Sequence, residues 1–387
     1  MGKQENLELY IHIPFCKKKC AYCDFLSAPA TEMMQEQYVH CLLAEIKEKA
    51  PFYANYQIST IFIGGGTPSI LRAGFILDIM EAVHRAFHVK KDAEVTLECN
   101  PKTISFEKLL FYQKAGINRI SIGLQSTENA ELKELGRIHT YEDFLESYDL
   151  IRKAGFSNVN IDLMSALPYQ TLKSYEKTLQ RVLQLRPEHI SAYSLIIEEG
   201  TPFYEKYESD EILREQGKIP EALPSEETER TMYEMTKELL KQHGYFRYEI
   251  SNYAKKGYEC EHNIGYWTRE NYLGLGLGSA SLVEEKRFSN TRELKKYLSG
   301  DFTIENQEIL NKNARIEEFM FLGLRLTKGV SQAQFLNQFG LSIENVYGKV
   351  LTKLQREGLL AKKDGRIFLT EQGLDVSNYV MAQFLFD

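Results

Sequence analysis

Three cysteines lie close together near the start of the chain, in the segment Cys16-Lys-Lys-Lys-Cys20-Ala-Tyr-Cys23. Thiolates are soft ligands for zinc or iron-sulfur clusters, and three of them so close in sequence can surround one metal centre. A structural zinc site normally has four protein ligands, whereas this segment supplies three. The spacing therefore favours a [4Fe-4S] cluster with one iron left open. The alternative is a zinc loop completed by a distant residue such as Cys99.

Polar residues also stand near the ends of several later strand-like segments. Gly64-Gly65-Gly66-Thr67-Pro68 follows the second segment, and successive glycines let a backbone approach a ligand closely. The polar side chains in comparable places are Glu98 at the end of the third segment, Gln125 at the end of the fourth, Arg137 beyond it and Asp162 late in the fifth. Parallel α/β proteins bind ligands at the carboxyl edge of the sheet, so we expect these residues to line one site.

Strands and helices must alternate to position these residues. Short β-branched or aromatic runs predict strands at 7–13, 59–63, 94–98, 118–124, 158–163 and 189–197. Apolar residues at helical spacing predict helices at 33–49, 70–87, 105–115, 141–154 and 171–185. The alternation predicts a parallel sheet with helical crossovers, which is either an incomplete (β/α) barrel or a doubly wound sheet.

The second half of the chain has a different pattern. The charged segment 199–226 predicts a long excursion or lid, followed by a helix at 226–243. Further on, the predicted elements are helices at 313–326, 331–338 and 342–357, a hairpin with an Asp364-Gly365 turn, and a last helix from residue 371. This order predicts a winged-helix-like α+β domain. Ten Lys and Arg against eight Asp and Glu over 312–387 favour a packing or docking module over a DNA reader.

The composition excludes several classes of protein. The 387 residues include 47 Lys and Arg against 54 Asp and Glu, a net charge of −7, which argues against a general binder of nucleic acid or anionic membranes. No run approaches the ~20 apolar residues of a membrane span. Six cysteines are too few for a disulfide scaffold, so we expect a protein of the reducing cytoplasm.

The segment LYIHIPFCKKKCAYC, with Tyr22 before Cys23, resembles the radical S-adenosylmethionine (SAM) superfamily. The resemblance implies an incomplete parallel (β/α)6 TIM-like barrel. It also implies that Cys16, Cys20 and Cys23 hold a [4Fe-4S] cluster whose open iron is chelated by SAM. By the same resemblance, Tyr10 and Tyr22 flank the cofactor, Gly65, Gly66 and Thr67 hold its amino-acid end, and Glu98, Gln125, Arg137 and Asp162 line the rest of its site.

Further motifs resemble one branch of that superfamily, which contains oxygen-independent coproporphyrinogen III oxidases (HemN) and HemW-type haem chaperones. They are HIPFC, GGGTPS, GLQS, LGR-H, NIDLM-ALP and YEISNYA. The oxidase pattern continues to a fourth cysteine, and Phe25 occupies that position here. The HNxxYW segment, with His262, Asn263, Tyr266 and Trp267, is typical of the chaperones and is linked with haem binding. Imidazole can ligate haem iron, and aromatic rings suit a flat macrocycle.

The resemblance therefore implies a haem chaperone that binds haem and a SAM-coordinated [4Fe-4S] cluster and delivers haem to an acceptor protein. The expected partners are haem, that acceptor and an electron donor, with a homodimer possible in principle. The alternatives are oxidative decarboxylation of coproporphyrinogen III and a zinc-stabilised binding protein. The expected domains are the barrel at 1–226, a connecting haem-motif region at 227–309 and the winged-helix-like domain at 310–387.

Overall fold

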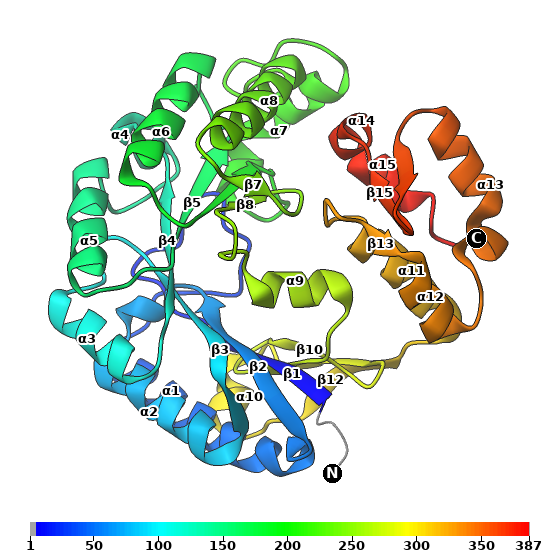
Figure 1. Ribbon diagram of the computed structural model, residues 1–387. Helices are drawn as coiled ribbons and strands as arrows, with labels where there is room; N and C mark the ends of the chain where they lie inside the picture. Colours follow the sequence, from blue (N-terminus) through cyan, green and yellow to red (C-terminus); the bar gives the residue numbers. More distant parts are fainter. Residues whose placement is uncertain (1–4, 387) are drawn as a thin grey trace.

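Six parallel strands form the centre of the molecule in the computed structural model, which describes residues 5–386. The strands are β1 (Glu5–Ile13), β2 (Tyr56–Gly65), β3 (His88–Cys99), β4 (Arg119–Gln125), β5 (Val159–Ser165) and β6 (His189–Ser194). The connecting helices are α1 (Glu32–Lys49), α2 (Ala73–Ala86), α3 (Phe106–Lys114), α4 (Asn129–Glu134), α5 (Tyr141–Lys153) and α6 (Leu172–Leu185). These helices lie outside the curved sheet (Figure 1). The fold is therefore the expected incomplete barrel, and the doubly wound alternative is wrong.

Alternation along the strands separates an apolar outer face from a polar inner face. In β1, Leu7, Leu9 and Ile11 are fully buried in the main hydrophobic core. Glu8 and His12 alternate with these apolar residues in the sequence. Because successive side chains of a strand point to opposite faces, Glu8 and His12 lie on the inner face. Ionisable side chains of β1 therefore point into the barrel interior.

The sheet continues beyond the barrel strands at both edges. At one edge β9 (Tyr272–Leu275) pairs in parallel with β1, and β10 (Ala280–Val283), β11 (Lys286–Asn290) and β12 (Ile304–Ile309) follow in antiparallel order. At the other edge β6 pairs with β8 (Asn252–Ala254), which pairs with β7 (Phe246–Arg247). The alternating glycines of YLGLGLGSA predict a strand where β9 lies. The other five added strands were not predicted, because each has only two to six residues and too little alternation to detect.

A short helix, α9 (Glu261–Thr268), lies within the open side of the barrel (Figure 1). Gly265 permits its close approach to β1, because a Cβ atom at this position would lie 2.0 Å from Oε1 of Glu8. The sequence HNxxYW is therefore carried on a helix that packs against the interior face of the barrel.

The segment expected as an excursion or lid contains a helix, and another helix follows it. Residues Pro202–Glu215 form α7, capped by Thr201, and α8 (Glu226–Gln242) follows close to its predicted bounds. Phe203 is buried, and its backbone N–H donates to the carbonyl of Ala21 at 3.0 Å. The helix α7 thus supports the loop that carries the cysteines. Sequence reasoning missed it because charged residues obscure its apolar face.

The C-terminal part has the expected winged-helix-like arrangement. Its elements are α11 (Lys312–Gly323), β13 (Val330–Ser331), α12 (Gln332–Phe339), α13 (Ile343–Arg356), β14 (Leu360–Lys363), β15 (Arg366–Leu369), α14 (Glu371–Asp375) and α15 (Ser377–Ala382). The Asp364-Gly365 turn joins β14 to β15, with φ of 50° and 71° at its two residues. The two-residue strand β13 was not predicted, and it adds a third strand to the wing.

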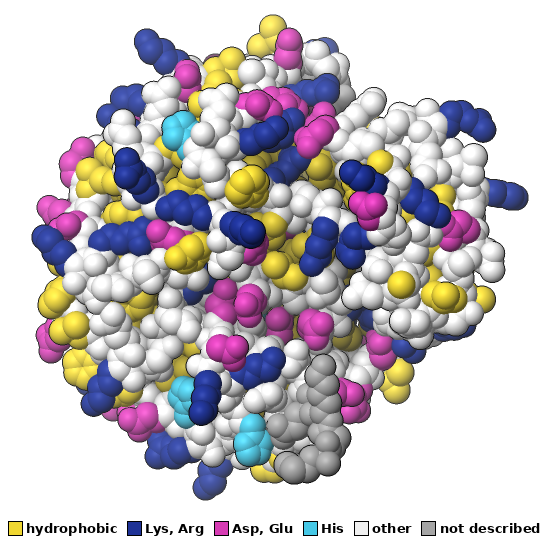
Figure 2. Space-filling view, viewed as in Figure 1, with side chains coloured by type: hydrophobic (Ala, Val, Ile, Leu, Met, Phe, Trp, Pro, Cys, Tyr) yellow, Lys and Arg dark blue, Asp and Glu magenta, His cyan; other side chains and the backbone are white. Residues whose placement is uncertain are grey.

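Two large hydrophobic clusters stabilise the chain. The first extends from Leu7 to Phe302 and includes the barrel, and the second extends from Ile316 to Phe384. The division of the chain at residues 226 and 309 stays a prediction. On the face shown in Figure 2, Lys and Arg are interspersed with Asp and Glu. Within residues 5–386, no helix has the length and apolar character needed to cross a membrane.

Candidate functional site

The three clustered cysteines lie in the loop after β1, and all three are half-buried. Two backbone hydrogen bonds fix this loop. The N–H of Cys16 donates to the carbonyl oxygen of Ala28 at 3.1 Å, and the N–H of Ala21 donates to the carbonyl oxygen of Leu135 at 3.0 Å. All three thiols line a single cavity of about 340 Å³. The structure thus brings the three cysteines together at one cavity.

Two polar side chains donate toward the thiols. Oγ1 of Thr67 lies 3.5 Å from Sγ of Cys16, and Nη1 of Arg137 lies 3.7 Å from Sγ of Cys20. Donors of this kind stabilise thiolates, which are the ligand form of cysteine. Across residues 5–386, no three His, Cys, Asp or Glu side chains converge as they would around one metal ion. Each cysteine of a cubane cluster binds a separate iron, so three thiols around one cavity suit a [4Fe-4S] cluster.

The polar residues expected at the sheet edge do gather in the same cavity. Its walls include Tyr22, Gly65, Gly66, Thr67, Glu98, Gln125, Arg137 and Asp162. They come from the cysteine loop, the ends of β2 to β5 and the segment after α4. Carboxyl ends of parallel strands meet at one edge, which is why positions so far apart in the sequence come together.

Among the residues expected to bind SAM, Tyr10 does not line this cavity. It lies deeper in the barrel, where its hydroxyl and Nδ1 of His12 are 2.9 Å apart. Nε2 of His12 in turn lies 2.9 Å from the carbonyl oxygen of Leu26, just after the cysteine loop. Tyr10 is therefore placed to support the cysteine loop through His12.

The glycine run lets the cysteine loop lie directly on the end of β2. Gly65 has a φ of +114°, a conformation that side-chain-bearing residues rarely adopt. A Cβ atom on Gly66 would lie 2.6 Å from the carbonyl oxygen of Phe15, and the N–H of Thr67 donates to that oxygen at 2.7 Å. Any side chain on Gly66 would displace the start of the cysteine loop.

Buried carboxyl groups give the cavity an unusual electrostatic character. Burial, and then the nearby Asp162, raises the pKa of Glu98 to about 8. Burial also raises the pKa of Asp162. The N–H of Gly65 donates to Oε2 of Glu98 at 3.0 Å. Groups of this kind accept hydrogen bonds from the hydroxyl or ammonium groups of a bound ligand.

Two buried polar atoms at the cavity lack a hydrogen-bond partner among the described residues. They are Nε of Arg137 and Oε1 of Gln125. The other end of the Arg137 guanidinium is engaged, since Nη2 donates to Oδ1 of Asn100 at 2.6 Å and to the carbonyl of Gly123 at 2.8 Å. Unpaired buried polar atoms are costly, so their position favours a polar ligand such as the amino-acid or ribose part of SAM.

Sequence reasoning missed several residues of this cavity. Asn100 holds both Arg137 and Thr67, donating from Nδ2 to the Thr67 hydroxyl at 2.8 Å. The position of Asn100 immediately after β3, at the edge of the sheet, could have identified it as a residue of this cavity. Met164, Tyr193 and Ile196 also line the cavity. They had no detectable signal, because apolar residues at strand ends look like ordinary core positions.

The HNxxYW residues are divided between two environments. His262 is buried inside the barrel, with Nδ1 2.7 Å from Oγ1 of Thr60 and Nε2 3.1 Å from the hydroxyl of Tyr266. Its ring stacks on Phe62 at a centroid distance of 5.2 Å. Burial, and then Arg119, lowers the pKa of His262 to about 3, so its imidazole is neutral at physiological pH.

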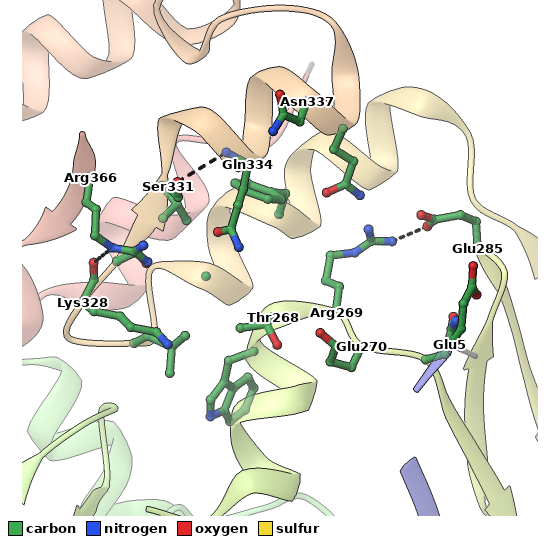
Figure 3. A pocket seen from close by; sticks show the side chains of 18 of the residues that line it. Glu5, Thr268, Arg269, Glu270, Glu285, Lys328, Ser331, Gln334, Asn337 and Arg366 are labelled. Carbon is green, nitrogen blue, oxygen red and sulfur yellow. Dashed lines mark hydrogen bonds and ion pairs between the residues drawn. The ribbon is translucent and has the colours of Figure 1, made fainter. Parts of the chain in front are cut away.

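Trp267, at the other end of the motif, faces the C-terminal domain. The guanidinium of Arg325 lies over its indole ring at 4.2 Å from the centroid. Trp267 also lines a cavity of about 690 Å³ between the end of α9, the β10–β11 turn and the C-terminal domain (Figure 3). Asn263 lies half-buried on α9 between the two environments.

Comparison with known proteins identifies the family. The radical SAM superfamily model matches residues 10–182, and the HemN C-terminal domain model matches residues 310–376. The chain is 37% identical to the "Heme chaperone HemW" of Lactococcus lactis, over 99% of this chain and 98% of that protein. The chain belongs to the HemW family. Further members are the HemW proteins of Bacillus subtilis, with 37% identity over 97% of this chain and 98% of that protein, and of Escherichia coli, with 34% identity over 100% of both.

The HemW family assignment agrees with the fold. A solved structure of coproporphyrinogen III oxidase (HemN) from Escherichia coli, described as a radical SAM enzyme, superposes with a TM-score of 0.84. It shares 25% sequence identity, over 98% of this chain and 90% of that one. The resemblances drawn from HIPFC, GGGTPS and HNxxYW are thereby confirmed. Membership of the radical SAM superfamily implies a [4Fe-4S] cluster and SAM.

Proposed function

We propose that this HemW-family protein is a haem chaperone, which binds haem and a SAM-coordinated [4Fe-4S] cluster and delivers haem to an acceptor protein. The observation that carries the proposal is the match over nearly the entire chain to proteins named as haem chaperones. The winged-helix-like domain is included in that match, so the resemblance is not limited to the barrel.

The residues of the smaller cavity have defined roles in this proposal. Cys16, Cys20 and Cys23 would hold the cluster, which when bound supplies one-electron chemistry. The remaining residues proposed to bind SAM are Tyr22, Gly65, Gly66, Thr67, Glu98, Gln125, Arg137 and Asp162. Tyr10 supports the cysteine loop through its contact with His12.

The HNxxYW residues His262, Asn263, Tyr266 and Trp267 are proposed to serve haem. Two of them have limited access to a ligand, because His262 and Tyr266 are hydrogen-bonded to one another inside the barrel. Ligation of haem iron by His262 would break its bonds to Tyr266 and Thr60. Trp267, in contrast, already lies on a cavity large enough for a small molecule.

The second candidate function is oxidative decarboxylation of coproporphyrinogen III. The structural likeness to HemN favours it, whereas Phe25 at the position of the oxidase's fourth cysteine opposes it. We further propose the chain divisions at 226 and 309, an electron donor for the cluster and an acceptor protein as parts of the chaperone account.

One experiment separates these functions. The protein is reconstituted anaerobically with iron and sulfide, then assayed with SAM, dithionite and coproporphyrinogen III, and in parallel titrated with haem. The chaperone proposal predicts saturable haem binding without protoporphyrinogen formation. Protoporphyrinogen formed over many turnovers would contradict it. A zinc-stabilised protein would contain zinc and lack the absorption near roughly 410 nm of a thiolate-bound cluster.

A further inference from the structure

A continuous chain of hydrogen bonds lies behind the cysteine cavity. It begins at Cys260, the residue that precedes α9, whose backbone N–H donates to the hydroxyl oxygen of Tyr248 at 3.2 Å. The Tyr248 hydroxyl lies 2.8 Å from Nε2 of His189, and Nδ1 of His189 lies 2.6 Å from Oδ1 of Asn160. Nδ2 of Asn160 donates to Oδ1 of Asp162 at 2.7 Å. The chain therefore ends at a carboxyl group that lines the cavity.

The first donor fixes the direction of every hydrogen bond in this chain. A backbone N–H can only donate, so the Tyr248 oxygen accepts from Cys260 and the Tyr248 proton is directed to Nε2 of His189. Burial lowers the pKa of His189 well below its usual range, so its neutral imidazole has one donor and one acceptor. Because Nε2 accepts, Nδ1–H donates to Oδ1 of Asn160, and this turns Nδ2 toward Asp162. The chain thus presents a donor to the Asp162 carboxylate.

The two middle residues of the chain are buried and fully hydrogen-bonded. His189 and Asn160 are 0% and 2% exposed, and both ring nitrogens of His189 have a partner. Oδ1 of Asn160 also accepts from the Ser191 hydroxyl at 3.1 Å, and Nδ2 also donates to the Ser121 hydroxyl at 2.8 Å. An amide has two donors and two acceptor positions, and Asn160 uses all four. The position of the amide is therefore fixed from several sides.

Asp162 is held at both of its carboxylate oxygens. Asn160 lies two residues before it on β5, so the two side chains point to the same face of the sheet. Oδ1 accepts from Asn160, and Oδ2 accepts from the Ser121 hydroxyl at 3.1 Å. Burial raises the pKa of Asp162, and these hydrogen bonds oppose that effect because they favour the ionised form. A carboxylate held in this way still has lone pairs for the hydroxyl groups of a ligand.

We propose that Asn160 and His189 are positioning residues for SAM, which hold the Asp162 carboxylate in the orientation that accepts hydrogen bonds from the cofactor. This inference rests on the proposed binding of SAM in the cysteine cavity. Neither Asn160 nor His189 lines that cavity, so both act through Asp162 and not by contact with the cofactor. Tyr248 secures the far end of the chain and connects it to the residue before α9.

The test measures the Kd for SAM by equilibrium dialysis against the full chain, reconstituted anaerobically with its cluster. His189→Leu removes the donor to Asn160 and is expected to raise the Kd about tenfold, because a buried hydrogen bond is lost. Tyr248→Phe removes only a hydroxyl and is expected to raise the Kd about fivefold, so the proposal stays testable if the first variant does not fold. The matched control is Tyr245→Phe, because the buried Tyr245 hydroxyl donates to the carbonyl oxygen of Pro187 at 2.6 Å, outside the chain. Its Kd stays within about twofold of wild type.

Further measurements separate a positioning role from general damage. Iron and sulfide contents should stay at the wild-type level in both variants, because the chain ends at Asp162 and not at a cysteine. His189→Asn retains a donor near the place of Nδ1 and should restore the Kd to within about threefold of wild type. In an Asp162→Asn background, His189→Leu should change the Kd by less than about twofold, because the group through which His189 acts has been altered.

Three results would overturn the positioning role. They are a wild-type Kd in both His189→Leu and Tyr248→Phe, loss of the cluster from both variants, and an undiminished effect of His189→Leu in the Asp162→Asn background. Absence of SAM binding by the wild-type protein would instead refute the proposed cofactor site itself.

Discussion

At the residue scale, the cysteine triad is the feature on which the smaller cavity depends. Cys20 receives a hydrogen bond from Arg137, and Cys16 receives one from Thr67. Cys20→Ala is expected to abolish the cluster, because two thiolates cannot hold a cubane. Iron and sulfide content after reconstitution should fall to background. Cys41→Ala is the control, since this half-buried thiol on α1 lies outside the cavity. Normal iron and sulfide in the Cys20 variant would refute the cluster assignment.

The buried carboxyl of Glu98 gives a prediction for pH. Burial and Asp162 raise its pKa from 4.5 to about 8, so between these values the folded state binds a proton that the unfolded state releases. The contribution of Glu98 to the free energy of unfolding is therefore largest below pH 4.5, its pKa in the unfolded state, and it is lost as the pH rises through 8. Glu98→Gln removes the dependence. Its Tm relative to wild type should rise by ~2 °C or more between pH 5 and pH 9. An unchanged difference in Tm across that range would show that Glu98 titrates normally.

At the element scale, the site exists because several separate segments meet the cysteine loop. The loop contacts β2 at the glycine run, α7 through Phe203 and β1 through His12. Gly66→Ala places a Cβ atom against the carbonyl of Phe15 and should lower cluster occupancy well below wild type, as measured by iron content. Gly74→Ala is the control, because its Cβ would meet nothing within 4 Å. Full occupancy in the Gly66 variant would mean that the loop tolerates displacement.

The elements also explain what the sequence could predict. The barrel strands have long apolar runs, and several of their helices have a clear start, such as the capping box of Thr140 and Asp143 at α5. Residues at strand ends were correctly grouped because the topology brings those ends together. The burial of His262 was not predictable, since it depends on Thr60, about 200 positions away. Two of the short added strands likewise depend on distant segments, since β9 pairs with β1 and β8 pairs with β6.

At the scale of the whole molecule, α9 connects the barrel to the C-terminal domain. Arg269, at the end of α9, forms ion pairs with Glu318 at 3.0 Å and Glu285 at 2.6 Å, and Arg325 covers Trp267. A ligand beside Trp267 would therefore contact both parts of the molecule. Because Trp267 is the only tryptophan, its fluorescence reports on this junction without interference.

The contact between Arg325 and Trp267 can be tested separately. Arg325→Ala is expected to shift the Trp267 emission to longer wavelength, because the exposed indole meets water, and to cost about 0.5–2 kcal/mol of stability. Arg356→Ala, an exposed arginine on α13, is the control and should change neither quantity. An unchanged emission maximum in the Arg325 variant would contradict the proposed packing of the junction.

The most direct test of the central claim is titration of the anaerobically reconstituted full chain with haem while Trp267 fluorescence is recorded. The account predicts saturable quenching at one haem per chain, with Soret absorbance that saturates at the same point. Trp267 belongs to the motif proposed to serve haem, so haem bound there should quench its emission strongly. Undiminished emission at saturating haem, or Soret absorbance that never saturates, would contradict a haem site beside the HNxxYW motif.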